Sequence, residues 1–170
     1  MNNYGFVRVA AAIPQVKVAN CKFNTERIES MIKSAAEKQV QIICFPELCI
    51  TGYTCADLFN QDLLIQEAEK TLIQLVNNTA KINIISIVGL PIRYGNNLYN
   101  VAVAFGQGKI LGVVPKTYLP NYNEFYERRW FGSGDTLQTD KIKIGNEEFP
   151  FGTNILFKSG KACFAIEICE

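Results

Sequence analysis

Short apolar segments alternate with longer amphipathic ones through the first half of the chain. The apolar segments lie at residues 6–13, 41–45 and 84–90, and each is followed by a proline. The two segments between them, about 24–39 and 61–80, repeat apolar residues at the spacing of one helical face. Near-continuous apolar strands that alternate with helices are typical of a sheet covered by helices. The sequence therefore predicts an α/β fold.

Finer features extend this prediction. We expect the first helix to begin at Asn24, whose side chain can accept a hydrogen bond from a free backbone N–H. Residues 98–105 and 109–115 predict a hairpin, because the Gly-Gln-Gly between them suits a tight turn. The remaining expected elements are a polar aromatic loop and three short strands, at residues 117–131, 141–144, 154–158 and 162–168.

The composition argues against several functional classes. Hydrophobic residues make up 48% of the 170 residues, which is typical of a globular protein. Seventeen basic and sixteen acidic residues leave a net charge of +1, which gives no basis for nucleic-acid binding or an acidic membrane surface. No apolar run approaches the ~18 residues of a membrane span, and no targeting segment is visible. We therefore expect a cytoplasmic protein.

The sequence contains no histidine. Ser-His-Asp and Cys-His catalytic groups and histidine metal sites cannot be built from this chain alone. A proton carrier must then be a carboxylate, lysine, tyrosine or cysteine. None of the six cysteines forms a C-x-x-C pair, and we expect those in apolar runs, such as Cys44 and Cys163, to be buried.

Three reactive side chains follow predicted strands. Glu47, Lys116 and Cys169 come just after the segments ending at residues 45, 115 and 168. Carboxyl ends of strands are where α/β sheets bind ligands. A carboxylate, an amine and a thiol are sufficient for acyl transfer without histidine. Each also has a simpler interpretation, as a helix-start glutamate, a solvated lysine and a core cysteine.

The sequence segments around these residues resemble those of a known family. F-P-E-L-C-I-T-G-Y at 45–53, P-K-T-Y-L-P-N-Y-N-E-F-Y-E at 115–127 and A-I-E-I-C-E at 165–170 resemble the glutamate, lysine and cysteine segments of the nitrilase superfamily of carbon–nitrogen hydrolases. The continuation R-R-W-F and Y-T-C-A-D-L-F at 53–59 are similar to the amidase domain of glutamine-dependent NAD synthetases. Many relatives carry histidine where this chain has Tyr118, which favours the synthetase group over a generic nitrilase.

The resemblance implies a nitrilase-type α-β-β-α sandwich. Residues 1–170 would be its N-terminal part, with the remainder and an ATP-dependent synthetase domain absent. That the chain ends directly after an apolar strand agrees with this expectation. No cofactor or metal is implied for these residues, while ATP and magnesium would serve the absent domain. The implied partners are glutamine, the synthetase domain of the same full-length chain and further copies in a homo-oligomer.

The resemblance also implies roles for individual residues. Cys169 would be the nucleophile, Glu47 the general base and then acid, and Lys116 with the backbone N–H of Glu170 the oxyanion donors. Glu124 is similar to the family's second acid, although a solvated loop glutamate is the alternative. Residues of the glutamine pocket would be Tyr53, Tyr122 and Phe125.

The function that follows is hydrolysis of glutamine, with the ammonia used to amidate ATP-activated deamido-NAD. Two alternatives stay open: a stand-alone hydrolase for another small amide, and a non-catalytic module with a degraded site. We expect the 170 residues alone to have little activity, because the sheet would be incomplete and Cys169 would lie at a chain end.

Overall fold

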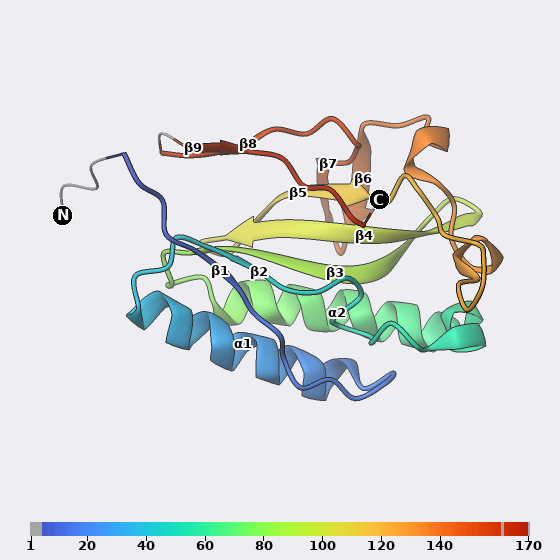
Figure 1. The fold of residues 1–170 in the computed structure, drawn as a ribbon, viewed down its shortest axis with the longest axis horizontal. Helices are drawn as coiled ribbons and strands as arrows, with labels where there is room; N and C mark the ends of the chain where they lie inside the picture. Colours follow the sequence, from blue (N-terminus) through green and yellow to red (C-terminus); the bar gives the residue numbers. More distant parts are fainter. Residues whose placement is uncertain (1–4, 161, 170) are drawn as a thin grey trace.

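The computed structural model describes residues 5–160 and 162–169 as a sheet with two helices packed on one face (Figure 1). Five strands pair in their order along the chain: β1 (Val9–Ala11), β2 (Ile42–Cys44), β3 (Ile85–Tyr94), β4 (Asn97–Gly106) and β5 (Lys109–Pro115). The two helices are α1 (Cys21–Glu37) and α2 (Asp62–Asn78). The α/β prediction is confirmed.

Smaller elements lie in the second half of the chain and in the loops. Two hairpins are formed by β6 (Lys141–Ile144) with β7 (Glu147–Pro150) and by β8 (Phe157–Ser159) with β9 (Ala162–Phe164). Figure 1 shows β8 and β9 on the side of the sheet opposite the helices. Short 3-10 turns occur at Ala56–Asn60, Glu127–Arg129 and Gly134–Thr136.

The topology brings several strand ends to one edge of the sheet. Strands β1, β2 and β3 are parallel, because α1 and α2 carry the chain back between them. Strands β3, β4 and β5 are antiparallel neighbours, so β5 runs in the same direction as β3. The carboxyl ends of β2, β3 and β5 and the start of β4 therefore share one edge.

The tight turn between β4 and β5 is also confirmed. Gln107 and Gly108 both have positive φ angles, 51° and 75°, as a two-residue hairpin turn of the primed type requires. This geometry follows the right-handed twist of the flanking strands, and it fixes the register in which β5 returns along β4.

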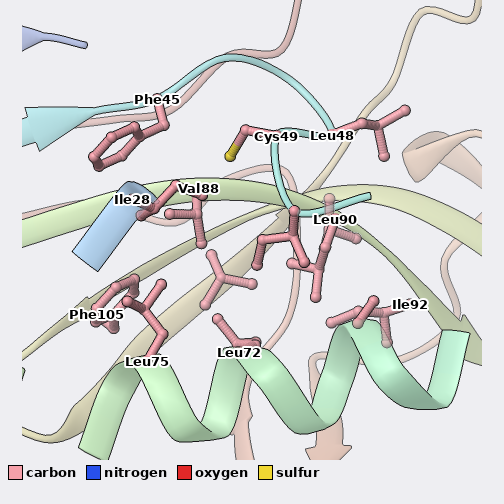
Figure 2. Close-up of a cluster of buried hydrophobic side chains, with 14 of the residues drawn as sticks. Ile28, Phe45, Leu48, Cys49, Leu72, Leu75, Val88, Leu90, Ile92 and Phe105 are labelled. Atoms are coloured by element: carbon pink, nitrogen blue, oxygen red, sulfur yellow. The ribbon is translucent and has the colours of Figure 1, made fainter. Parts of the chain in front are cut away.

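The core lies between the sheet and the helices. Figure 2 shows Leu72 and Leu75 of α2 facing Val88 and Leu90 of β3. Leu48, from the loop after β2, is fully buried in the same cluster. Burying a large aliphatic side chain contributes about 1.5–3 kcal/mol, so this loop is anchored to the core.

Two predictions about element boundaries are wrong. Asn20, not Asn24, caps α1, because its Oδ1 accepts from the backbone N–H of Phe23. Asn24 is buried within the helix and hydrogen-bonds the backbone of Lys17 and Ile50. The third strand does not end before Pro91 but continues to Tyr94, because pairing with β4 along its whole length outweighs the one N–H that proline lacks.

The last strands also differ from the prediction. The expected strand at 162–168 ends at Phe164, and β8 begins three residues later than expected. β7 was not predicted, because its sequence Glu-Glu-Phe-Pro lacks a β-branched pattern. It forms through pairing with β6, which supplies a partner that propensity does not show.

Gly89 of β3 tests how tightly the loop after β2 is seated. A Cβ built at this position would lie 2.3 Å from the backbone nitrogen of Leu48 and 3.0 Å from Cα of Glu47. We expect Gly89→Ala to lower the free energy of unfolding by about 1–3 kcal/mol, because backbone cannot yield as a flexible side chain does. Thermal or urea unfolding measures the change.

Gly152→Ala is the matched control. Its nearest contact would be the side-chain oxygen of Asn154 at 3.3 Å, which can move aside. A Gly89→Ala protein as stable as the Gly152→Ala protein would contradict the close approach of the loop to β3.

Candidate active site

A buried lysine lies at the centre of the candidate site. Lys116 is 1% exposed, and its Nζ lies 2.7 Å from Oε1 of Glu47 and 2.8 Å from Oε1 of Glu127. Burial alone would lower the pKa of Lys116. The hydrogen bonds and charges of Glu127 and Glu47 outweigh burial, so the pKa is raised above its ordinary value. Lys116 therefore stays in its ammonium form and keeps its ability to donate hydrogen bonds.

The sheet explains why these side chains meet. Lys116 directly follows β5, and its backbone N–H donates to the carbonyl of Asn100 at 2.8 Å. Glu47 lies three residues beyond β2, at the same edge. The prediction that residues 47 and 116 converge therefore follows from strand direction, and the structure brings them into contact.

The loop that carries Glu47 has an unusual backbone. Leu48 has a φ of 52°, a left-handed conformation that is costly for a branched side chain. The buried Leu48 side chain and a hydrogen bond from Ile50 N–H to the Gly89 carbonyl, 3.1 Å, hold this conformation. Packing thus fixes where the Glu47 carboxylate lies.

Glu127 is a site residue that sequence reasoning missed. It is 2% exposed, and its Oε1 accepts both from Lys116 and from the hydroxyl of Tyr53 at 2.7 Å. Its Oε2 is buried and has no hydrogen-bond partner among the described residues. The surrounding charges, in E-R-R, resemble a solvated segment. The signal that could have identified Glu127 is charge balance, because a buried lysine beside Glu47 can bind a second carboxylate.

Tyr53 is linked to the same cluster. Burial, followed by the hydrogen bond to Glu127, raises the pKa of the Tyr53 hydroxyl well above its ordinary value. The hydroxyl therefore stays protonated and donates a hydrogen bond to Glu127. Tyr53 is 38% exposed, so part of the ring remains open to a ligand.

An exposed clamp joins the two loops that carry the carboxylates. The Asp57 carboxylate accepts hydrogen bonds from Nε and Nη2 of Arg129, at 2.7 and 2.9 Å. It also accepts one from the indole N–H of Trp130, at 2.9 Å. These hydrogen bonds, those of Arg129 first, lower the pKa of Asp57. Since Arg129 ends the turn that contains Glu127, the clamp fixes that turn against the loop after β2.

Cys169 reaches the site along the uncovered face of the sheet. Ile166 and Ile168 pack against the apolar cluster of this face, which contains Ile42, Ile87, Ala102, Ala104, Val114 and Phe157. Cys169 then borders a cavity of about 120 Å³ that Glu47 and Asn100 also line. Its φ is 58°, a second left-handed residue at the site. Glu47, which is paired with Lys116, and Cys169 thus line one cavity.

Comparison with known proteins assigns the fold. A family model described as carbon–nitrogen hydrolase matches residues 8–162. The chain belongs to the carbon–nitrogen hydrolase family. A glutamine-dependent NAD(+) synthetase from Mycobacterium tuberculosis is 37% identical over 170 residues, covering 98% of this chain and 25% of that protein.

Solved structures agree with the family. A glutamine-dependent NAD(+) synthetase from Cytophaga hutchinsonii superposes with a TM-score of 0.88 and 30% identity, covering 96% of this chain and 28% of that chain. An amidase from Nesterenkonia sp., 19% identical with a TM-score of 0.64 over 84% of this chain and 53% of that one, shares the fold. The chain spans about a quarter of the length of the synthetases it matches. The expected nitrilase-type fold is confirmed, and the described residues supply one helix layer and one sheet of it.

Not every predicted site residue of this carbon–nitrogen hydrolase reaches the cluster. Glu124 is exposed and forms no hydrogen bond or ion pair with Lys116 in the described part of the chain, because the 3-10 turn directs Glu127 inward instead. Tyr122 and Phe125 stack edge to face with ring centroids 5.8 Å apart, and Tyr122 is largely exposed. Glu170 lies outside the described residues.

Residues 5–160 and 162–169 contain neither a candidate metal site nor a helix that could span a membrane. No group of three or more histidine, cysteine, aspartate or glutamate side chains there could hold a metal ion. No helix of this part of the chain is long and apolar enough to span a membrane.

Removing the buried ammonium tests the ion-pair cluster. We expect Lys116→Met to lower the free energy of unfolding by about 3–5 kcal/mol, because Glu127 would remain buried without its cation. Adding Glu127→Gln should restore much of the loss. Urea unfolding of the single and double variants measures this. The Lys70→Met protein, which loses an exposed pair with Glu67, should change by less than about 1 kcal/mol.

The raised pKa of Lys116 fixes the pH dependence of the same stability. The ion pairs contribute fully below the ordinary lysine value of 10.5, and their contribution is lost as the pH rises through the higher folded value. Equal stability of wild type and Lys116→Met at neutral pH would contradict the role of the cluster.

The cysteines should divide into two reactivity classes. Burial raises the pKa of Cys21 and of Cys49 to about 12, so these thiols stay protonated and shielded. The prediction that Cys44 and Cys163 are buried is wrong: both are exposed, as is Cys169. Cys44 shares the face of Ile42, away from the helices.

We expect iodoacetamide at pH 8 to modify the exposed thiols of the folded protein and to reach Cys21 and Cys49 only after denaturation. Peptide mass spectrometry follows each site. Native labelling of Cys49 at the rate seen for Cys163 would contradict the described core.

Proposed function

We propose that this chain is part of an amidase that hydrolyses glutamine through a cysteine thioester. Its ammonia would supply the ATP-dependent amidation of deamido-NAD by another part of a longer protein. The observation that carries the proposal is that Glu47, paired with the buried Lys116, lines a cavity that Cys169 also lines. A chain without histidine needs such a set for acyl transfer.

The first chemical step needs a base for the thiol. Free thiols have a pKa of ~8.5, so a neutral-pH nucleophile requires proton removal. Glu47 lines the cavity with Cys169, and in our proposal it is the carboxylate that takes the proton. The sulfur then attacks the side-chain amide carbon, and Glu47 returns the proton to the departing nitrogen as ammonia leaves.

Lys116 is suited to stabilise the oxyanion. An ammonium has three N–H donors, and two of them are occupied by Glu47 and Glu127. The third is available to the oxygen of the tetrahedral intermediate, together with the backbone N–H of Glu170. One such donor is typically worth about 3–4 kcal/mol of activation free energy. Water then attacks the thioester and releases glutamate and the free thiol.

Glu127 replaces Glu124 as the second acid in this proposal. It is the second carboxylate bound to Lys116, and its buried Oε2 is an acceptor for a donor group of a bound substrate or water. The glutamine pocket remains assigned to Tyr53, Tyr122 and Phe125, with Tyr53 positioned by its bond to Glu127.

The length of the relatives sets the wider context. Because the chain spans about a quarter of the matched synthetases, we propose that residues 1–170 are the N-terminal part of an amidase domain. The longer protein would be cytoplasmic and oligomeric, with ATP and magnesium used in its synthetase part. The 170 residues alone would have little turnover.

A stand-alone hydrolase of another small amide is the second candidate. The family match and the fold shared with the Nesterenkonia amidase favour it, because neither specifies glutamine. A non-catalytic module is disfavoured by the intact cluster around Lys116.

The decisive experiment compares two nitrogen sources in the longer protein. We expect Cys169→Ala to abolish glutamine-dependent NAD formation by more than about 10³-fold while ammonium-dependent formation continues, because only the thioester step is lost. Cys163→Ala, an exposed cysteine nearby, is the control and should keep both activities. Wild-type protein that forms no NAD from ammonium would support the stand-alone hydrolase. Glutamine-dependent activity in Cys169→Ala would overturn the site.

A further inference from the structure

A buried asparagine touches both halves of the Glu47–Lys116 pair. Asn100 is 1% exposed and is the fourth residue of β4, between Pro91 of β3 and the end of β5. Its backbone carbonyl accepts from the N–H of Lys116 at 2.8 Å. Its side-chain Nδ2 donates to Oε1 of Glu47. Since a carboxylate only accepts, this contact defines the orientation of the amide group.

The contacts of Glu47 are unequal between its two oxygens. Oε1 accepts from both Asn100 and Lys116, whereas the described residues provide no hydrogen-bond donor to Oε2. Two charge-assisted donors hold negative charge on Oε1 and fix the plane of the carboxylate. Oε2 can therefore accept a proton from the cavity without displacing a hydrogen-bond donor.

We propose that Asn100 is a positioning residue, which engages Oε1 of Glu47 and so directs proton exchange with the Cys169 thiol to Oε2. The proposal rests on the proposed cysteine amidase function. The proton leaves Sγ and bonds to Oε2, and in the collapse of the intermediate it passes from Oε2 to the leaving nitrogen. No other reactant is needed.

Other ionisable groups around Glu47 do not replace this contact. Lys116 binds the same oxygen, and Glu127 pairs with Lys116. Tyr53 donates to Glu127 rather than to Glu47. The remaining ionisable side chains of the cavity wall are Cys44, Glu167 and Cys169. Asn100, by contrast, is a neutral donor, so its hydrogen bond to Glu47 can be removed without changing the net charge.

The test uses Asn100→Ala and Asn100→Asp in the longer protein. We expect Asn100→Ala to lower kcat for glutamine hydrolysis on the order of 10- to 100-fold with KM little changed, because the substrate pocket is retained. The acid limb of the kcat/KM profile should move to higher pH by about one unit, since a carboxylate that loses a donor keeps its proton to higher pH. Asn100→Asp should move the limb further, because a second carboxylate adjoins the first.

Asn24→Asp is the matched control. Asn24 is also fully buried and also bridges backbone groups, but it lies within α1. It should lower the melting temperature and leave the acid limb where it is in wild type. The two Asn100 variants are independent, so one that fails to fold leaves the other to decide.

The outcomes separate this proposal from the proposed function. Unmoved acid limbs in the Asn100 variants, with activity reduced equally at every pH, would show that the residue only stabilises the fold. If wild-type protein hydrolyses no glutamine, the proposed substrate fails. The pH profile of Cys169 alkylation by iodoacetamide then decides alone: a shift in the Asn100 variants supports the positioning role, and an unchanged profile refutes it.

Discussion

The ion-pair cluster around Lys116 is the interaction on which the site depends. An ammonium that is almost fully buried is tolerated only because two carboxylates lie within 2.8 Å of it. Those carboxylates come from segments 80 residues apart, Glu47 and Glu127, so the cluster also ties the loop after β2 to the loop after β5. The geometry of the candidate site and the stability of these loops therefore depend on the same contacts.

The sheet makes this arrangement reproducible. Strand direction alone brings the end of β5 and the start of β4 to the edge where β2 ends. The left-handed Leu48 and the close approach of Gly89 then set the last few residues before the cavity. At the rim, the exposed Asp57–Arg129 clamp holds the turn that presents Glu127.

Sequence patterns predicted the fold class, both long helices, the β4–β5 hairpin and the convergence of Glu47 and Lys116 at one edge of the sheet. These features follow from hydrophobic periodicity and from strand direction, which are local or topological properties. Element boundaries were less accessible: capping by Asn20 rather than Asn24 depends on where the first turn actually closes. β7 depends on a pairing partner.

Glu127 could not be distinguished from Glu124 by sequence, because both lie in one polar loop and only the 3-10 turn decides which side chain points inward. The same limit applies to Asn100. In the sequence it is a single polar residue within an apolar strand. Its contacts with Lys116 and Glu47 can be identified only in the folded structure.

The three reactive groups are held by different kinds of force. Directional hydrogen bonds fix Glu47 and Lys116. The Cys169 thiol is instead positioned by Ile166 and Ile168, which pack on the apolar face of the sheet. Dispersion and burial have shallow angular dependence, so a methylene gained or lost beneath those isoleucines displaces the sulfur without breaking any polar bond. Variation in the apolar layer under Cys169 thus offers a graded way to change the position of the thiol relative to Glu47, whereas the hydrogen bonds of the acid–amine pair are either kept or lost.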